Sequence, residues 1–375
     1  MFRNYKFKNF NIRLVFYIVA LTLIGIAVIG SANEDYLNRQ ILGLILGLIV
    51  MIGVSFIDYS FVLQFSNLIY ALIVVILGAV LVLGDSSKGA TRWIDLGFIR
   101  FQPSELAKVL LVLFFANYLM RHEEDLNTLR ILVLTAVLAA IPLLLIVKEP
   151  DLSTTIVTFC ILFSMLFVGG LDKKYVITVV LILVIAVSVV LLACIIFKDS
   201  LKDNYQLLRI LAWLYPDEYT ASSYQQQNSI MAIGSGNFLG KGLYNTNYDS
   251  VKNGNYISEP QTDFIFAVAG EELGFVGCLL ILLLLFLISF ECIRMSRKAR
   301  DMAGRIICIG MSALVGFQSF VNICVVTGLF PNTGLPLPFV SYGLTSLVTL
   351  YFGMGFVLNI GLQTKRQSAQ KGGLL

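Results

Sequence analysis

The stretch YVITVVLILVIAVSVVLLACIIF, residues 175–197, contains no charged side chain. An apolar segment of about 17 residues or more is long enough to cross a lipid bilayer as an α-helix. Comparable segments recur along nearly the whole chain of 375 residues, of which 58% are hydrophobic and only 13% are charged. The mean hydropathy is +0.85. This composition is too apolar for a soluble domain of this size and indicates a polytopic membrane protein.

The distribution of the apolar segments predicts the architecture. We expect an all-α membrane protein with about ten transmembrane helices, forming a single domain over residues 1–375. The ten predicted spans are residues 12–29, 41–57, 61–83, 104–120, 129–147, 154–169, 175–197, 264–292, 306–329 and 340–360.

Lysine and arginine residues predict the orientation, because cytoplasmic loops retain positive charge. The strongest basic group is RMSRKAR, residues 294–300, and we interpret it as a topology signal rather than a nucleic-acid site. With ten spans the two termini lie on the same side as this group, in the cytoplasm. Two substantial loops, about 84–103 and 198–262, are then expected on the outer face.

The loop at 198–262, between the seventh and eighth spans, is far longer than an ordinary connection, and such loops are usually functional or disordered. Its segment YQLLRILAWLYP, residues 205–216, has leucines at every third position, which favours a short helix lying in the headgroup region. The next segment, YQQQNSIMAIGSGNFLGKGL, residues 224–243, passes from polar to apolar residues and then to glycines. We therefore expect an ordered loop with short interfacial helices.

The glycine-rich part, GSGNFLGKGL, residues 234–243, does not fit a nucleotide site. A P-loop has four residues between its first glycine and the Gly-Lys pair, and Ser or Thr follows the lysine. Here Gly236 leaves three residues, Gly234 leaves five, and Lys241 is followed by Gly242. Two interpretations stay open: the exposed backbone N–H groups and the lysine approach a phosphate, or the glycines only supply turns with positive φ.

Charged residues at the edges of the apolar spans are a second source of information, because each is costly there unless it is paired or lines a watery cavity. In FQPSELAK, residues 101–108, Glu105 and Lys108 share one helix face. They either form the wall of a polar cavity, or act separately as a helix-start carboxylate and a snorkelling lysine. KEPDLSTT, residues 148–155, places Glu149 and Asp151 around a proline at the outer ends of two spans.

The stretch SEPQTDFIFAVAGEELG, residues 258–274, contains the most informative single residue. Asp263 lies where the long outer loop becomes the eighth span. The positive end of a helix dipole favours its ionised form, so it is either a functional carboxylate or a helix cap. Glu271 and Glu272 lie about two turns further on and are expected to face protein, since an unpaired carboxylate in lipid is costly.

Cysteine and histidine restrict the chemistry. All six cysteines fall within or at the ends of apolar spans and are expected to pack as small hydrophobic residues. The only histidine, His122, is in a predicted cytoplasmic loop. A histidine-based triad or zinc site on the outer face is therefore excluded, and chemistry there must use carboxylates, lysines, arginines or hydroxyls.

Several long motifs together resemble the SEDS family (shape, elongation, division and sporulation), the RodA/FtsW type of peptidoglycan glycosyltransferase. The resemblance covers almost the whole chain, and the residues of the motifs SKGATRW and TGLPLPFVSYG are closer to those of RodA. One departure is Ser258, which stands at the family's proline position, with Pro260 following Glu259. The motifs are GATRWIDLGFIRFQPSELAK (89–108), EPDLSTT (149–155), the segment 224–243, SEPQTDFIFAVAGEELGFVG (258–277) and GLFPNTGLPLPFVSYGLTS (328–346).

The resemblance implies an enzyme that polymerises lipid II, a disaccharide-pentapeptide on undecaprenyl pyrophosphate, with inversion, on the outer face of the bacterial cytoplasmic membrane, for cell elongation and shape. It implies a class B penicillin-binding protein as partner and no nucleotide. Asp263 would be the catalytic carboxylate, as a general base or as the ligand of a divalent cation, Mg or Mn. The implied substrate-binding residues are Arg92, Lys108 and Lys241 for the pyrophosphate, Glu105 to hold Lys108, and Asp151 and Glu259.

Other functions remain as alternatives. A lipid II flippase would also use intramembrane charges, which often line a translocation path. The gathering of polar features on one face, and the lack of a visible inverted repeat in the sequence, favour an enzyme. A non-catalytic scaffold, and a polymerase of the division or sporulation type, are further alternatives.

Overall fold

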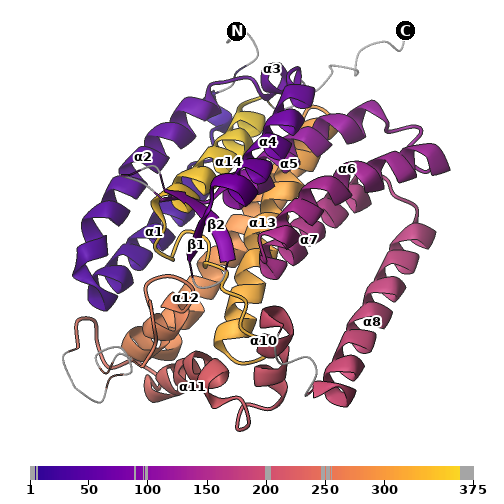
Figure 1. Ribbon diagram of the computed structural model, residues 1–375. Coiled ribbons are helices and arrows are strands. Elements are labelled where there is room, and N and C mark those ends of the chain that lie inside the picture. The colour runs from indigo at the N-terminus through magenta and orange to yellow at the C-terminus, as the bar shows by residue number, and fades with distance from the viewer. Residues whose placement is uncertain are drawn as a thin grey trace, which may run out of the picture.

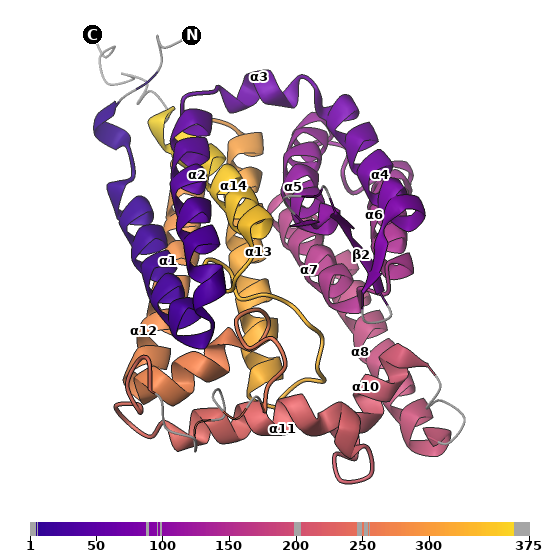
Figure 2. The ribbon, with the colours of Figure 1, turned by 60° about the vertical axis from the view of Figure 1, so that its left-hand side comes forward.

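The computed structural model describes residues 5, 7–87, 90–95, 97, 100–198, 204–245, 250, 254 and 256–363 (Figure 1). Five basic residues near the two termini that are predicted to face the cytoplasm lie outside the described residues: Arg3, Lys6, Lys365, Arg366 and Lys371. Helices dominate the described chain, and α1 (Ile12–Ala32) begins at the same end of the helical bundle as α14 (Leu344–Leu362) ends, called here the terminal end (Figures 1 and 2).

Within the described residues, nine helices are long and apolar enough to cross a membrane. A tenth apolar helix, α7 (Leu152–Val168), is shorter, with 17 residues. Each of the ten predicted spans overlaps one of these helices, so the all-α membrane fold is confirmed. The nine are α1 (Ile12–Ala32), α2 (Leu37–Ser55), α4 (Ser66–Leu83), α5 (Pro103–Arg121), α6 (Leu129–Lys148), α8 (Lys173–Ile196), α12 (Ile265–Ser296), α13 (Met302–Val326) and α14 (Leu344–Leu362).

Several predicted spans begin at the wrong residue. Helices α2 and α13 begin at Leu37 and Met302, before the predicted residues 41 and 306. The span expected at 61–83 is divided into a short helix, α3 (Tyr59–Leu63), and α4, because Asp58 caps α3 and the chain turns at Gln64 and Phe65. The span expected at 340–360 begins only at α14. Ser341 lies in the preceding loop, where its hydroxyl donates to the Thr262 carbonyl and accepts from a backbone N–H.

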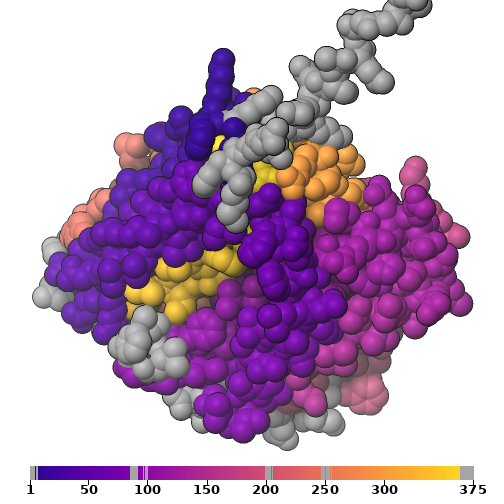
Figure 3. Space-filling model, turned by 90° about the horizontal axis from the view of Figure 1, so that it is seen from above, coloured from indigo at the N-terminus to yellow at the C-terminus, as the bar shows by residue number. Residues whose placement is uncertain are grey.

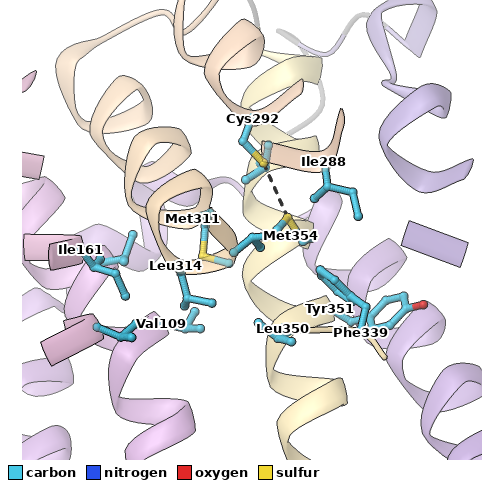
Figure 4. Close-up of a cluster of buried hydrophobic side chains, with 14 of the residues drawn as sticks. Val109, Ile161, Ile288, Cys292, Met311, Leu314, Phe339, Leu350, Tyr351 and Met354 are labelled. Atoms are coloured by element: carbon cyan, nitrogen blue, oxygen red, sulfur yellow. Dashed lines mark hydrogen bonds between the residues drawn. The ribbon is translucent and has the colours of Figure 1, made fainter. Parts of the chain in front are cut away.

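A buried set of side chains from α5, α7, α12, α13 and α14 forms the centre of the bundle (Figure 4). Glycines let these helices approach closely: a Cβ at Gly353 would overlap the Met311 side chain, and one at Gly310 would meet Val112. Small residues at helix contacts are typical of membrane bundles. All six cysteines are unpaired and five are buried, as expected; Cys292 Sγ lies 3.8 Å from Met354 Sδ.

Helix α8 stands apart from the bundle (Figure 1). Cys194 is the only buried side chain within it among the described residues, and its apolar side chains are exposed all round. Such a surface suits contact with lipid. Seen from the end that carries the termini, part of α14 is visible between the first helices and the segment containing α3 and α4 (Figure 3).

The opposite end of the bundle, called here the α11 end, carries the long loop and two short helices, α10 (Tyr205–Leu214) and α11 (Thr220–Ser235). Helix α10 is anchored by buried Leu211 and by Trp213, whose Nε1 donates to the Gly328 carbonyl at 2.9 Å. The prediction of short helices in this loop is confirmed. Two 3₁₀ turns, η1 (Phe7–Asn9) and η2 (Glu34–Tyr36), complete the helical elements.

The loop before α5 contains a small antiparallel sheet that the sequence did not predict. Its strands, in the order β1-β2-β3, are β1 (Asp85–Ser87), β2 (Ala90–Asp95) and β3 (Arg100–Phe101). Asp85 pairs with Trp93, and Ile94 pairs with Phe101. The strands are too short to give a clear alternating pattern, and their importance is that β2 carries Arg92 towards the α6–α7 turn.

The predicted orientation can be tested by thiol labelling. A cysteine placed at Ser258, which is exposed at the α11 end, should react with an impermeant thiol reagent in intact cells. A cysteine at Lys298, which is exposed in the basic group at the terminal end, should react only after permeabilisation, because the membrane shields it. The parent chain with its own cysteines is the control. The reverse pattern would overturn the orientation.

Candidate active site

Asp263 lies at the α11 end, directly before α12. Helix α12 begins at Ile265 and its N-cap residue is Phe264, with no side-chain cap hydrogen bond, so Asp263 is not the helix cap. The Asp263 carbonyl accepts from Asn322 Nδ2 at 2.8 Å. A Cβ built on Gly334, whose φ is +73°, would lie 3.1 Å from Asp263 Oδ2, so this loop glycine packs directly against the carboxylate. Asp263 is therefore held by tertiary contacts rather than by helix capping.

Several charges act on Asp263. Burial raises the pKa of the Asp263 carboxyl to about 6, against the attraction of Arg92 and Arg209, while Asp151 and Glu259 add to the increase. A carboxylate of this kind is a better proton acceptor near neutral pH than an ordinary aspartate. Arg92, Asp151 and Glu259, all predicted from the sequence, are therefore close enough to act electrostatically on Asp263. Arg209, predicted only as part of an interfacial helix, joins them.

Arg92 joins the small sheet to the turn between α6 and α7. Its Nη1 lies 3.7 Å from Asp151 Oδ2, its Nε donates to the Glu149 carbonyl at 3.4 Å, and its Nη2 donates to the Pro150 carbonyl. Asp151 also caps α7 by accepting from the Thr154 N–H at 3.0 Å. Together these contacts fix the Arg92 guanidinium group beside the buried carboxylate of Asp151.

Glu105 and Lys108 form the predicted ion pair. Lys108 Nζ lies 2.7 Å from Glu105 Oε1 and donates to Gln318 Oε1 at 2.6 Å, and both charged side chains are buried. The Ser346 hydroxyl donates to Glu105 Oε2 at 3.1 Å. Gln318 Nε2 in turn donates to the Pro336 carbonyl at 3.0 Å. The pair thus supports the loop between α13 and α14 that packs against Asp263.

Lys241 and the glycine-rich loop pack on an interruption of α12. Gly274 has φ 65° and ψ −162° within this helix. The freed backbone groups are paired by the loop: Lys241 and Gly242 donate N–H groups to the carbonyls of Glu271 and Glu272, both at 2.9 Å. In the other direction, Phe275 and Val276 donate to the carbonyls of Asn237 and Phe238.

Three glycines, Gly236, Gly240 and Gly274, are explained by this close backbone contact. A Cβ at Gly236 would overlap the Gly270 carbonyl, one at Gly240 the Glu272 carbonyl, and one at Gly274 the Gly240 nitrogen. Of the two interpretations left open by the sequence, turns with positive φ apply to Gly240 and Gly242, whereas Gly236 is needed for the close approach to α12. Lys241 Nζ also lies 2.8 Å from Glu271 Oε1, which is buried as predicted.

Glu272, also buried as predicted, accepts from the Ser31 hydroxyl at 2.5 Å, which ties the interrupted helix to α1. Glu259 is exposed, with φ 55°, and its carbonyl accepts from the Thr262 N–H and hydroxyl just before Asp263. The predicted residues therefore fall into three groups: Arg92, Asp151 and Glu259 near Asp263, the buried pair in the bundle, and Lys241 at the helix interruption.

Two amides that organise the site were not predicted. Gln318 and Asn322 lie one turn apart on α13; Asn322 Nδ2 donates to the carbonyls of Asp263 and Leu335, the latter at 2.6 Å. The available signal was a pair of amide residues with helical spacing inside an apolar span. Buried amides in lipid-spanning helices are retained only when hydrogen-bonded.

A family model described as a cell cycle protein, FTSW_RODA_SPOVE, matches residues 5–366 of the chain. Among similar proteins, the probable peptidoglycan glycosyltransferase FtsW of Escherichia coli is 36% identical over 302 residues, covering 79% of this chain and 70% of that protein. The protein of the same name from Geobacter sulfurreducens is 32% identical over 375 residues, covering 96% of this chain and 97% of that protein.

Solved structures show the same fold. A structure described as "Structural coordination of polymerization and crosslinking by a peptidoglycan synthase complex" aligns with a TM-score of 0.78 and 29% identity, covering 96% of this chain and 98% of the other. The rod shape determining protein RodA of Thermus thermophilus aligns with a TM-score of 0.68 and 27% identity, covering 97% of this chain and 99% of the other.

The buried ion pair can be tested by a double-mutant cycle. Lys108→Met and Glu105→Gln should each lower the free energy of unfolding, by about 3–5 kcal/mol for a fully buried pair, because each leaves an unpaired buried charge. The double variant should lose less than the sum. Thermal unfolding in detergent measures this.

The exposed pair Lys198–Glu218, at 3.0 Å, provides the control, and Lys198→Met should change unfolding little. Additive effects of the two core substitutions would show that Glu105 and Lys108 do not stabilise each other.

Proposed function

This chain belongs to the FtsW/RodA/SpoVE family and is a peptidoglycan glycosyltransferase with several membrane-spanning helices, and from this premise we propose that it polymerises lipid II on the outer face of the cytoplasmic membrane. The single observation that carries the proposal is the environment of Asp263. Its carboxyl has a raised pKa of about 6 and lies where two arginines act on it at the α11 end. The topology in which both termini are cytoplasmic and the α11 end is outside is part of the same proposal.

In the proposed reaction, Asp263 takes the proton from the 4-hydroxyl of the acceptor sugar. The hydroxyl oxygen then forms the new glycosidic bond to the anomeric carbon of the donor, the bond from that carbon to the diphosphate oxygen breaks, and the configuration inverts. Diphosphate leaves with the electron pair and needs charge neutralisation more than a proton. A base and fixed cations can therefore suffice.

Arg92 and Arg209 are the cations best placed for the diphosphate, because both act on Asp263. Asp151 positions Arg92, and Glu259 lies at the exposed edge of the cluster. Lys108 and Lys241 each hold a carboxylate in the structure, so the diphosphate contact predicted for them requires an exchange of partners. In the proposal, Glu105 and Lys108 contribute by supporting the loop against Asp263.

A divalent cation, Mg or Mn, is an alternative use of Asp263. Within the described part of the chain, no three His, Cys, Asp or Glu side chains gather into a metal site. A cation would therefore be held by Asp263 together with diphosphate oxygens, a ligand set that suits Mg²⁺. Bound there, it would neutralise negative charge on the diphosphate.

A class B penicillin-binding protein is the proposed partner. The support is that this chain aligns over 96% of its length with a chain from a peptidoglycan synthase complex that coordinates polymerization and crosslinking. For the cellular role we propose elongation, from the RodA-like motifs. Division is the second candidate, favoured by the FtsW names of the similar proteins. Depletion separates them, because rods become round when elongation stops and form filaments when division stops.

The decisive substitution is Asp263→Asn. Asn keeps the size of Asp but cannot accept the proton, and loss of a general base typically costs about 10²–10⁴-fold in rate. We expect a folded protein that still co-purifies with its partner but makes almost no glycan from lipid II in detergent. Detergent removes the two sides needed for flipping, so polymer made by the wild type also excludes a pure flippase. Polymerisation by the Asn variant at near wild-type rate would show that Asp263 is structural.

The pH dependence gives a second test. Because burial raises the pKa of Asp263 to about 6, the protonated and inactive form accumulates as the pH falls through that value. The kcat/KM for lipid II polymerisation should therefore fall about tenfold per pH unit below about pH 6, as expected for a single essential base. An acid limb that begins only near the ordinary pKa of aspartate, 3.8, would contradict this environment.

A further inference from the structure

Glu149, which the proposed reaction does not use, has an unusual position. It follows α6 directly, and its side chain is completely buried. Neither carboxyl oxygen has a hydrogen-bond partner among the described residues. Arg92 reaches this turn but bonds the Glu149 backbone carbonyl, at 3.4 Å, and turns its Nη1 to Asp151. The nearest guanidinium is thus committed to other oxygens.

An ionised carboxylate in such a place would be costly, because a buried charge without a hydrogen-bonded partner loses its solvation. Burial and the nearby negative charge of Asp151 raise the pKa of Glu149 to about 8, against the attraction of Arg92. Among the described residues, two charged groups act on Glu149: Arg92 from β2, and Asp151 from the start of α7. A pKa of about 8 favours the protonated carboxyl at neutral pH.

The importance of this proton follows from the charges that share Arg92. Asp151 and Asp263 both interact with Arg92, and Arg209 is the only other cation among the described residues that acts on Asp263. An ionised Glu149 would add a third negative charge that acts on one guanidinium. The positive potential available for a diphosphate would fall, since an added charge acts strongly at low dielectric.

We propose that Glu149 works as a neutral carboxylic acid, and that its proton keeps the charge of Arg92 available to Asp263 and to the diphosphate of the substrate. Glu149 is then a positioning residue, because it acts through Arg92 and touches no reacting atom. The proposal rests on the proposed polymerisation of a diphosphate-linked substrate. It adds a second titrating group to the site, with the opposite requirement: Asp263 must lose its proton, and Glu149 must keep its own.

The test compares the wild type with Glu149→Gln, which holds the side chain permanently neutral. In the wild type, kcat/KM for lipid II should fall as the pH rises through about 8, the pKa of Glu149. In the Gln variant this loss should be absent, so the ratio of variant to wild-type kcat/KM should rise about tenfold between about pH 7 and pH 9. Taking the ratio cancels alkaline effects on the substrate, the partner and other residues.

Glu218→Gln is the matched control, because Glu218 is an exposed carboxylate at the same end, paired with Lys198 at 3.0 Å. Its ratio to the wild type should stay flat over the same range. A flat ratio for Glu149→Gln would overturn the proposal. If that variant does not fold, Glu149→Met makes the same neutral substitution without a polar group.

An infrared measurement tests the protonation itself and does not depend on activity. The difference spectrum between wild type and Glu149→Gln should contain the C=O stretch of a protonated carboxyl at neutral pH, and this band should disappear as the pH rises through about 8. Absence of the band at neutral pH would refute a neutral Glu149. If the band is present but neither the wild type nor the variant makes polymer, the proposed function is wrong, whereas the neutral state of Glu149 is confirmed.

Discussion

The α11 end depends on one constraint of the lipid environment: every backbone polar group at membrane depth must have a partner within the protein. The interruption of α12 at Gly274 frees carbonyls before it and N–H groups after it. The glycine-rich loop, residues 236–242, pairs with both sets. Only glycine permits this approach, since a Cβ at Gly236 or Gly240 would overlap the backbone of α12. The motif that resembles a phosphate loop is therefore the partner of a broken helix.

The interruption separates the first two turns of α12 from the rest, and these turns begin next to Asp263. They are held from several sides: Lys241 pairs with Glu271, Ser31 donates to Glu272, and Asn322 donates to the Asp263 carbonyl. The buried Lys108–Gln318 contact holds the facing loop through Pro336. A candidate catalytic carboxylate supported by so many fixed contacts is preorganised, which is how sites avoid reorganisation during reaction.

The sequence predicts the helices well because a span of apolar residues has one stable solution in lipid, a helix. It also places Glu105 and Lys108 on one helix face, since residues three apart on a helix are neighbours, and the structure shows that they pair. It could not predict the contact of Arg92 with Asp151 or the role of Asn322, because these join segments far apart in the chain. The strands escaped prediction because two to six residues carry too little periodic signal.

At the α11 end, two carboxyl groups have opposite requirements. Burial is the largest cause that raises the pKa of both Asp263 and Glu149, and their charged neighbours differ. Asp263 has two arginines acting on it, which hold its pKa at about 6 and leave it ionised at neutral pH. Glu149 shares only Arg92, whose donors are already engaged by Asp151 and by backbone carbonyls, and its pKa rises to about 8. Groups whose environments separate their pKa values in this way can divide acid and base roles at one pH. Burial, together with the positions of Arg92 and Arg209, therefore separates a carboxyl that can accept a proton near neutral pH from one that already carries it.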